Sequence, residues 1–116
     1  MIKLFEEYES GEYYSSITME KFDEYLGVGY INALNFTIVE IRRIIDYCNE
    51  KGGLYCNYGS GTIRIHMVLH GTISKFSINI YKLEDEWFVV RVFGHSYYRC
   101  DQMEGLIKLL GNKLKL

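Results

Sequence analysis

Proline is absent from this chain of 116 residues, and neither an internal repeat nor a low-complexity linker interrupts it. Long apolar runs are absent too: a run such as that from Trp87 to Val90 is far short of the ~20 residues that span a bilayer. The N-terminal residues turn acidic at Glu6 and lack the apolar stretch of a signal peptide. Because domains usually run to about 100–150 residues, the length predicts a single domain over residues 1–116, with no membrane anchor.

Cysteine is scarce. An odd number of cysteines is present, and no two of them form a C-x-x-C pair: Cys48, Cys56 and Cys100. The disulfide framework of a secreted protein normally uses an even number. The sequence therefore predicts a reduced, cytoplasmic protein. The sequence contains no cluster of zinc ligands, so neither a metal nor another cofactor is expected.

An excess of basic residues is missing as well, because 13 Lys and Arg residues stand against 15 Asp and Glu residues, for a net charge of −2. This balance does not favour strong binding to duplex nucleic acid, and it would suit a basic surface on a protein partner. No decisive catalytic motif is present. Gly59-Ser60-Gly61 lacks the Lys-Ser/Thr of a phosphate-binding loop and indicates a hairpin turn instead. The sequence thus predicts a protein that is not an enzyme.

Signals for helix starts are clear. Thr18, or alternatively Ser16, can cap a helix that runs to Leu26 and whose apolar side chains repeat on one helical face from Met19. Thr37 and Glu40 form a capping box at the start of a helix over 38–51, in which each side chain satisfies an unpaired backbone N–H. A pair of glycines follows this helix and ends it, since glycine adopts the left-handed conformation without penalty.

A third helix is predicted over residues 103–114. Asp101 and Glu104 can form a second capping box, and Met, Leu and Ile side chains make one apolar stripe. Gly105 and Gly111 lie inside this helix. Each glycine is expected to weaken it by about 1 kcal/mol relative to alanine.

Between the second and third helices the apolar pattern changes from a period of 3.6 to a period of 2. Aliphatic side chains alternate with others over residues 63–70, 76–81 and 87–93, which predicts three strands. Two shorter strands are expected at 55–58 and 96–99. Because the connections are short, neighbouring strands run antiparallel. The prediction is an α+β two-layer sandwich, an antiparallel meander of four to five strands with the helices packed on one face.

One face of this meander is predicted to show aliphatic side chains to the helices, and the other to show arginine and large aromatic side chains. The outward set is the candidate partner-binding site: Arg64, His66, Tyr81, Trp87 and Arg91. Arginine and aromatic residues on an uncovered sheet are typical of protein interfaces. Single-stranded nucleic acid also stacks on such faces. A third alternative is that the Trp87 side packs beneath the N-terminal segment.

Other groupings could have a chemical role, although a structural role is favoured for each. His66 and His70 would share a metal ion on a helix, but on a strand they lie ~13 Å apart. Cys100 stands at a helix start, where a thiolate is stabilised, and could act as a nucleophile with a histidine; a buried structural cysteine is the alternative. Acidic clusters could bind a cation or a basic partner, or form solvated faces, at residues 6–9, 20–24 and 84–86.

Two stretches, residues 80–90 (IYKLEDEWFVV) and 97–110 (YYRCDQMEGLIKLL), resemble small uncharacterised proteins of tailed phages and large viruses. The opening residues 2–8 (IKLFEEY) are similar to the short N-terminal leader common among proteins of large tailed phages. This resemblance implies no activity or site. Helices that bracket a meander are also similar in outline to frataxin. The acidic iron site that this outline implies would fall on residues 20–24 and 40–50, where no matching motif occurs.

Together these features predict a non-enzymatic interaction protein, phage-encoded and cytoplasmic in the host cell, that binds and modulates a host or viral protein. The contact is expected through the arginine and aromatic sheet face or through the acidic N-terminal region. The alternative function is binding of single-stranded nucleic acid through the same face. Exposed edge strands and a tyrosine-rich surface also suggest a homodimer.

Overall fold

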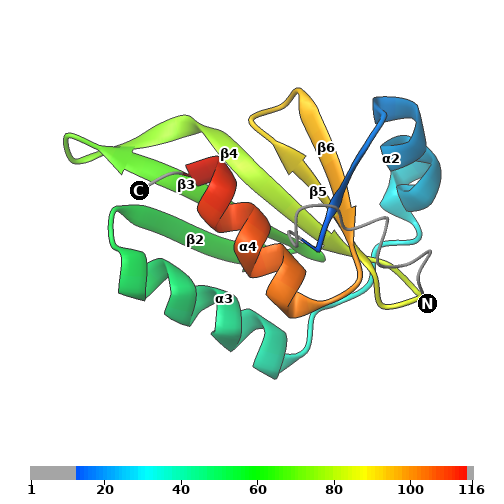
Figure 1. Cartoon of the computed structure of the whole chain (residues 1–116), viewed down its shortest axis with the longest axis horizontal. Coiled ribbons are helices and arrows are strands. Elements are labelled where there is room, and N and C mark those ends of the chain that lie inside the picture. The colour runs from blue at the N-terminus through cyan, green and yellow to red at the C-terminus, as the bar shows by residue number, and fades with distance from the viewer. Residues whose placement is uncertain (1–12, 115–116) are drawn as a thin grey trace.

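The computed structural model describes residues 13–114, so the opening stretch 2–8 and the acidic cluster 6–9 lie outside the described residues. It contains a six-stranded antiparallel sheet with the strand order β1-β6-β5-β4-β3-β2 (Figure 1). The strands are β1 (Ser15–Ile17), β2 (Leu54–Gly59), β3 (Thr62–Leu69), β4 (Thr72–Lys82), β5 (Phe88–Val92) and β6 (Ser96–Cys100). The helices are α2 (Met19–Leu26), the short 3-10 helix η2 (Val28–Tyr30), α3 (Ile38–Lys51) and α4 (Met103–Leu114).

The main core lies between the sheet and two of the helices, α3 and α4, which Figure 1 shows in front of the sheet. Strand alternation turns Ile63 and Ile65 of β3 toward this layer, together with Ile78 and Ile80 of β4, and all four side chains are buried. Removing such aliphatic surface from water is the dominant favourable contribution to folding. The aliphatic face expected from the sequence is therefore the face that the two long helices cover.

The helix α2 packs on the opposite face of the sheet. Its Phe22 and Leu26 are buried against Tyr81 and Val89, whose positions in β4 and β5 alternate with those of the main core. The prediction that all the helices pack on one face is therefore wrong for α2. The period of an amphipathic helix identifies the side that is buried, but it does not specify which face of a sheet receives that side.

The helix starts predicted at Thr18 and at Thr37 are confirmed, whereas no hydrogen bond of the capping box predicted for Asp101 and Glu104 is found among the described residues. The Thr18 side chain accepts a hydrogen bond from the Lys21 N–H at 3.1 Å. At the start of α3, Thr37 and Glu40 make both bonds of the capping box, with lengths of 2.8 and 3.1 Å. The last helix spans Met103–Leu114 as predicted. None of the helices in residues 13–114 is both long enough and apolar enough to cross a membrane.

The antiparallel sheet is confirmed, but it has six strands rather than four to five. The additional strand, β1, has three residues and pairs with β6, so it is too short to show an alternating pattern in the sequence. The β3–β4 and β5–β6 hairpins turn through His70-Gly71 and Phe93-Gly94. All four of these residues have positive φ angles, from 52° to 80°, as type I′ turns require.

Candidate partner-binding face

On the sheet face opposite the main core, α2 covers one half and leaves the other half open. Residues directly opposite each other on paired strands share a face, and the pairing aligns Asn57, Arg64, Asn79 and Arg91 in one row across β2–β5. We call this surface the open sheet face; it comprises Tyr55, Asn57, Arg64, His66, Lys75, Ser77, Asn79 and Arg91. Three of the five residues expected at the partner-binding site lie on it, namely Arg64, His66 and Arg91.

Charge is segregated between the sheet and the rest of the chain. The six strands contain no aspartate or glutamate, whereas they contain five lysine and arginine residues, Arg64, Lys75, Lys82, Arg91 and Arg99. Lys82 pairs with Glu40 at 3.0 Å and Arg99 pairs with Asp85 at 2.8 Å. The other three cations lie on the open sheet face, and within residues 13–114 no ion pair involves them. A chain of net charge −2 therefore presents a cationic sheet face.

The two arginines of this face flank one buried polar side chain. Asn79 lies opposite Arg64 on one side and Arg91 on the other, and it is 7% exposed. Because neighbouring strands are about 4.8 Å apart, the two arginine Cα atoms are separated by about 10 Å. The Ser77 hydroxyl donates a hydrogen bond to Asn79 Oδ1 at 2.8 Å. The position between the two arginines is thus held by a buried, hydrogen-bonded asparagine.

His66 ties the open sheet face to an irregular part of β4. Its ring nitrogen Nδ1 lies 2.8 Å from the carbonyl oxygen of Ser74, which can only accept, so Nδ1 carries the proton. The other nitrogen of the neutral ring, Nε2, is then an acceptor. The ring also lies beside Tyr55, with 6.1 Å between the ring centroids.

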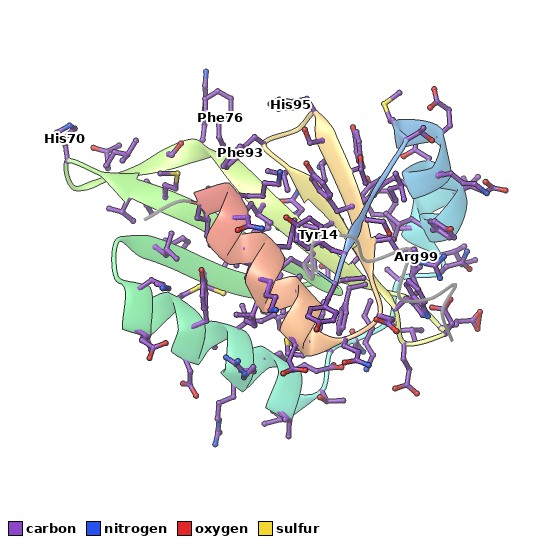
Figure 2. The ribbon with its side chains drawn as sticks, in the orientation of Figure 1. Tyr14, His70, Phe76, Phe93, His95 and Arg99 are labelled. Carbon is purple, nitrogen blue, oxygen red and sulfur yellow. The ribbon has the colours of Figure 1, made fainter. Side chains whose placement is uncertain are left out.

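Two pockets lie where β4 extends past the β5–β6 turn. The first, of about 310 Å³, is polar and belongs to the open sheet face; it is lined by Lys75, Phe76, Ser77, Asn79, Arg91, Phe93 and Gly94. The second, of about 330 Å³, is mostly apolar and is lined by Met67, Leu69, Ser74, Phe76, Phe93 and His95. Phe76 and Phe93 line both, and Figure 2 shows these two side chains near the same edge of the molecule.

Tyr81 does not lie on the exposed surface where the sequence places it. It is only 2% exposed, because α2 and η2 fold over this half of the face. The rings of Phe22 and Tyr30 meet it edge-on, with centroids 5.8 and 5.1 Å away. Burial is also the main reason why the pKa of its phenol is raised. The alternation correctly identifies the face that carries Tyr81, but α2 covers that position.

One face of the Trp87 indole is covered by the side chain of Arg99. The Arg99 guanidinium lies between two rings, 3.9 Å from the centroid of Trp87 and 4.2 Å from that of Tyr25. Arg99 also donates hydrogen bonds to the Tyr25 hydroxyl at 2.6 Å and to Asp85 at 2.8 Å. Such cation–π stacking stabilises the local fold and leaves one face of the indole unavailable to a partner. Trp87 therefore lies outside the open sheet face.

Lys75 is the cation of this face that the sequence analysis missed. The alternating pattern predicts a strand that starts at residue 76, whereas β4 begins at Thr72 and includes Lys75. A bulge interrupts the alternation there, because the pairing with β3 shifts between His66 and Val68. The absence of acidic residues across residues 54–83 is a signal in the sequence that could have identified the whole cationic face.

Cys100 is fully buried at the end of β6. Burial, with a smaller contribution from the neighbouring Asp101 carboxylate, raises the pKa of its thiol to about 12. A buried protonated thiol is a poor nucleophile at neutral pH. Within residues 13–114, no three His, Cys, Asp or Glu side chains cluster closely enough to hold a metal ion.

The raised pKa of Cys100 leads to an expected loss of stability in alkali. Below pH 9.0, its ordinary pKa, the thiol is protonated in both states and the stabilising contribution is fully present. As the pH rises toward about 12, only the unfolded state loses the proton, so the free energy of unfolding falls. We expect a decrease of at most about 1.4 kcal/mol per pH unit from this group. Urea titrations at several pH values should show a shallower decrease for Cys100→Ala; an unchanged slope would contradict this assignment.

Comparison with known proteins finds no match: no family model, no curated protein and no solved structure corresponds to this chain. The function is therefore argued from the geometry and charge of the open sheet face.

Proposed function

We propose that this chain is a non-enzymatic interaction protein that binds an acidic region of a host or viral protein through the open sheet face. The observation that carries this proposal is the segregation of charge, which leaves Arg64, Lys75 and Arg91 without a carboxylate partner among the described residues. Unpaired cations on a regular surface raise the rate of encounter with an acidic partner and align it. The net charge of the chain suggests a basic partner, but the charge of this face favours an acidic one.

The setting of the proposed interaction follows from the sequence. We propose a phage-encoded protein that acts in the cytoplasm of the host cell, where reducing conditions keep thiols free. The three free cysteines support this setting. The frataxin-like outline stays a prediction, supported by the order of α3, the meander and α4. Because no iron-site motif accompanies that outline, the proposal includes no metal chemistry.

Binding of single-stranded nucleic acid is the second candidate function. Unpaired cations lie beside exposed rings here, since Tyr55 is on the open sheet face and Phe76 is at the rim of its polar pocket. Bases stack on such rings while cations follow the phosphates. Anisotropy of a fluorescein-labelled oligothymidine should then rise on adding the protein at low salt and fall back as salt increases. An unchanged anisotropy at low salt would exclude this candidate.

Reversing the charge of the open sheet face is the test of the primary proposal. Affinity capture from host lysate, using the tagged full chain, would compare the variant Arg64→Glu with Arg91→Glu against the wild type. We expect the specific partner to be retained about tenfold less, because two attractive contacts become repulsive. The matched control is Arg42→Glu with Arg43→Glu, which changes the net charge equally on exposed positions of α3. Equal retention of the partner by both double variants would contradict the proposal.

A further inference from the structure

β4 is longer than the strand that pairs with it on one side. Its pairing with β5 ends where Ile78 lies opposite Val92, and the chain then turns away through Phe93-Gly94. On the other side, β3 accompanies β4 as far as Thr72. Residues 72–77 of β4 therefore form an edge of the sheet, even though β4 is a central strand over the rest of its length.

The backbone groups of this edge point toward the vacant side. The Phe93 N–H donates a hydrogen bond to the Ser77 carbonyl at 2.9 Å, so Ser77 turns its backbone toward the β5 side. Ile73 turns its backbone the same way, because Val68, its partner on β3, donates its N–H to the Gly53 carbonyl on the β2 side, so the Val68–Ile73 pair exchanges no backbone hydrogen bonds. The N–H and C=O groups of Ile73 therefore face the side on which β5 has already ended, and no strand of residues 13–114 pairs with them there.

The edge has little of the protection that exposed edges usually have. It contains no proline and only one charged residue, Lys75, although prolines and inward charges are common protective devices. Its apolar side chains are exposed, with Ile73 at 49% and Phe76 at 56%. A bulge, in which residues 74–76 stand opposite Met67 alone, bends β4 at this point. Bulges re-aim side chains and are frequent beside binding sites.

A pocket lies on each face of the same edge, and the two differ in chemistry. Lys75 and Arg91 line the polar pocket on the open sheet face, whereas Met67, Leu69 and Phe76 line the apolar pocket on the face that carries the core. Successive side chains of a strand point to opposite faces of a sheet. A strand added beside β4 would therefore place alternate side chains beside the cations and beside the apolar pocket.

We propose that residues 72–77 of β4 bind an extended segment of the partner protein as an added antiparallel strand, in which acidic and apolar residues alternate. This inference rests on the proposed function and specifies the partner's chemistry. Backbone pairing along an exposed edge supplies affinity, while pockets for alternate side chains supply specificity. The acidic residues contact Lys75 and Arg91, and the apolar residues enter the pocket beside Met67 and Phe76.

A synthetic probe tests the alternation. The probe is a fluorescein-labelled peptide of eight residues in which glutamate and valine alternate, titrated with the full chain and followed by anisotropy. We expect it to bind about tenfold or more tightly than two controls, namely the same residues arranged in two blocks and an alternating lysine–valine peptide. Equal binding of the alternating and block peptides would overturn the inference.

Backbone pairing is tested separately by removing N–H groups. Ile73→Pro should weaken binding more than Ile73→Ala, because both remove the isoleucine side chain but only proline removes the outward N–H. Peptides N-methylated at single residues test the same backbone pairing on wild-type protein, so the test holds even where the proline variant fails to fold. We expect methylation to abolish binding at every second residue and to be tolerated between them. Methylation tolerated at every position would overturn the inference.

The possible outcomes separate this inference from the function on which it rests. A periodic methylation effect together with a partner that is captured regardless of Arg64 and Arg91 supports the edge and contradicts the proposed function. A methylation effect without period, together with a partner whose capture requires Arg64 and Arg91, contradicts the edge alone. Displacement of the peptide by oligothymidine at low salt would assign the pocket to nucleic acid and overturn the inference. A concentration-dependent dimer that Ile73→Pro abolishes would assign the edge to a second copy and also overturn it.

Discussion

Replacing Gly105 with alanine is expected to lower the free energy of unfolding by about 2–3 kcal/mol, although alanine is the better helix former. A Cβ atom at Gly105 would collide with the carbonyl oxygen of Tyr13 and would lie 3.2 Å from the carbonyl carbon. These are backbone atoms, which cannot rotate away as the end of a flexible side chain can. Relief of the collision would have to displace the chain that leads through Tyr14 into β1, and Tyr14 is buried in the main core.

Gly111 in the same helix provides the matched control. A Cβ atom there would lie 3.6 Å from the Tyr47 hydroxyl, which is an ordinary van der Waals contact. Gly111→Ala should therefore raise the free energy of unfolding by about 0.5–1 kcal/mol through helix propensity alone. Urea unfolding followed by circular dichroism measures both effects. Stabilisation by alanine at both positions would show that the approach of Tyr13 to α4 is incorrect.

Glu40→Ala is expected to lower the free energy of unfolding by about 3 kcal/mol, because one carboxylate serves two structures. It accepts the Thr37 N–H at 2.8 Å as part of the capping box. It also lies 3.0 Å from the Lys82 Nζ, whose side chain is only 10% exposed at the end of β4. Alanine leaves the Thr37 N–H without its acceptor and the lysine without its counter-charge in a poorly solvated place, although the Thr37 side chain still caps the N–H of residue 40.

Two further variants separate these contributions. Glu40→Gln keeps an oxygen that can accept the Thr37 N–H, so we expect a smaller loss than with alanine. Lys82→Met removes the cation but keeps an aliphatic stem, and the Glu40 carboxylate left behind is 20% exposed and still accepts the Thr37 N–H. We expect it to lower the free energy of unfolding by less than about 1.5 kcal/mol. Chemical denaturation of all three variants gives the comparison, and equal losses for Glu40→Ala and Glu40→Gln would contradict a role in capping.

The parts of the fold that sequence reasoning predicts correctly depend on neighbouring residues. The capping box of Thr37 and Glu40 spans a single helical turn, and its two hydrogen bonds require only the residues between them. The pairing of Glu40 with Lys82 depends instead on two elements far apart in the chain, so no local pattern predicts it. Gly105 shows the same limit: helix propensity gives the cost of this glycine, but only the packed chain shows that Tyr13 requires it.

The sequence likewise predicts one part of the candidate site and not the other. The period of 2 assigns Arg64, His66, Arg91 and Tyr81 to the face opposite the main core, and the strand pairing agrees. It does not predict that α2 covers Tyr81, because covering depends on where a distant helix packs. Net charge does not describe the open sheet face, for a related physical reason. It adds residues on loops and helices to those on strands, whereas a partner meets only one surface.

The strand order has a consequence for the way the chain reaches this structure. From β2 to β6 each strand pairs with the next one along the sequence, so the sheet can grow by successive short-range hairpins, which close at little entropic expense. β1 is the exception, since Ser15 must find Arg99 near the other end of the chain. We therefore expect β1 to dock after the hairpins have formed. Its arrival brings Tyr13 against Gly105 and completes the packing around the start of the final helix.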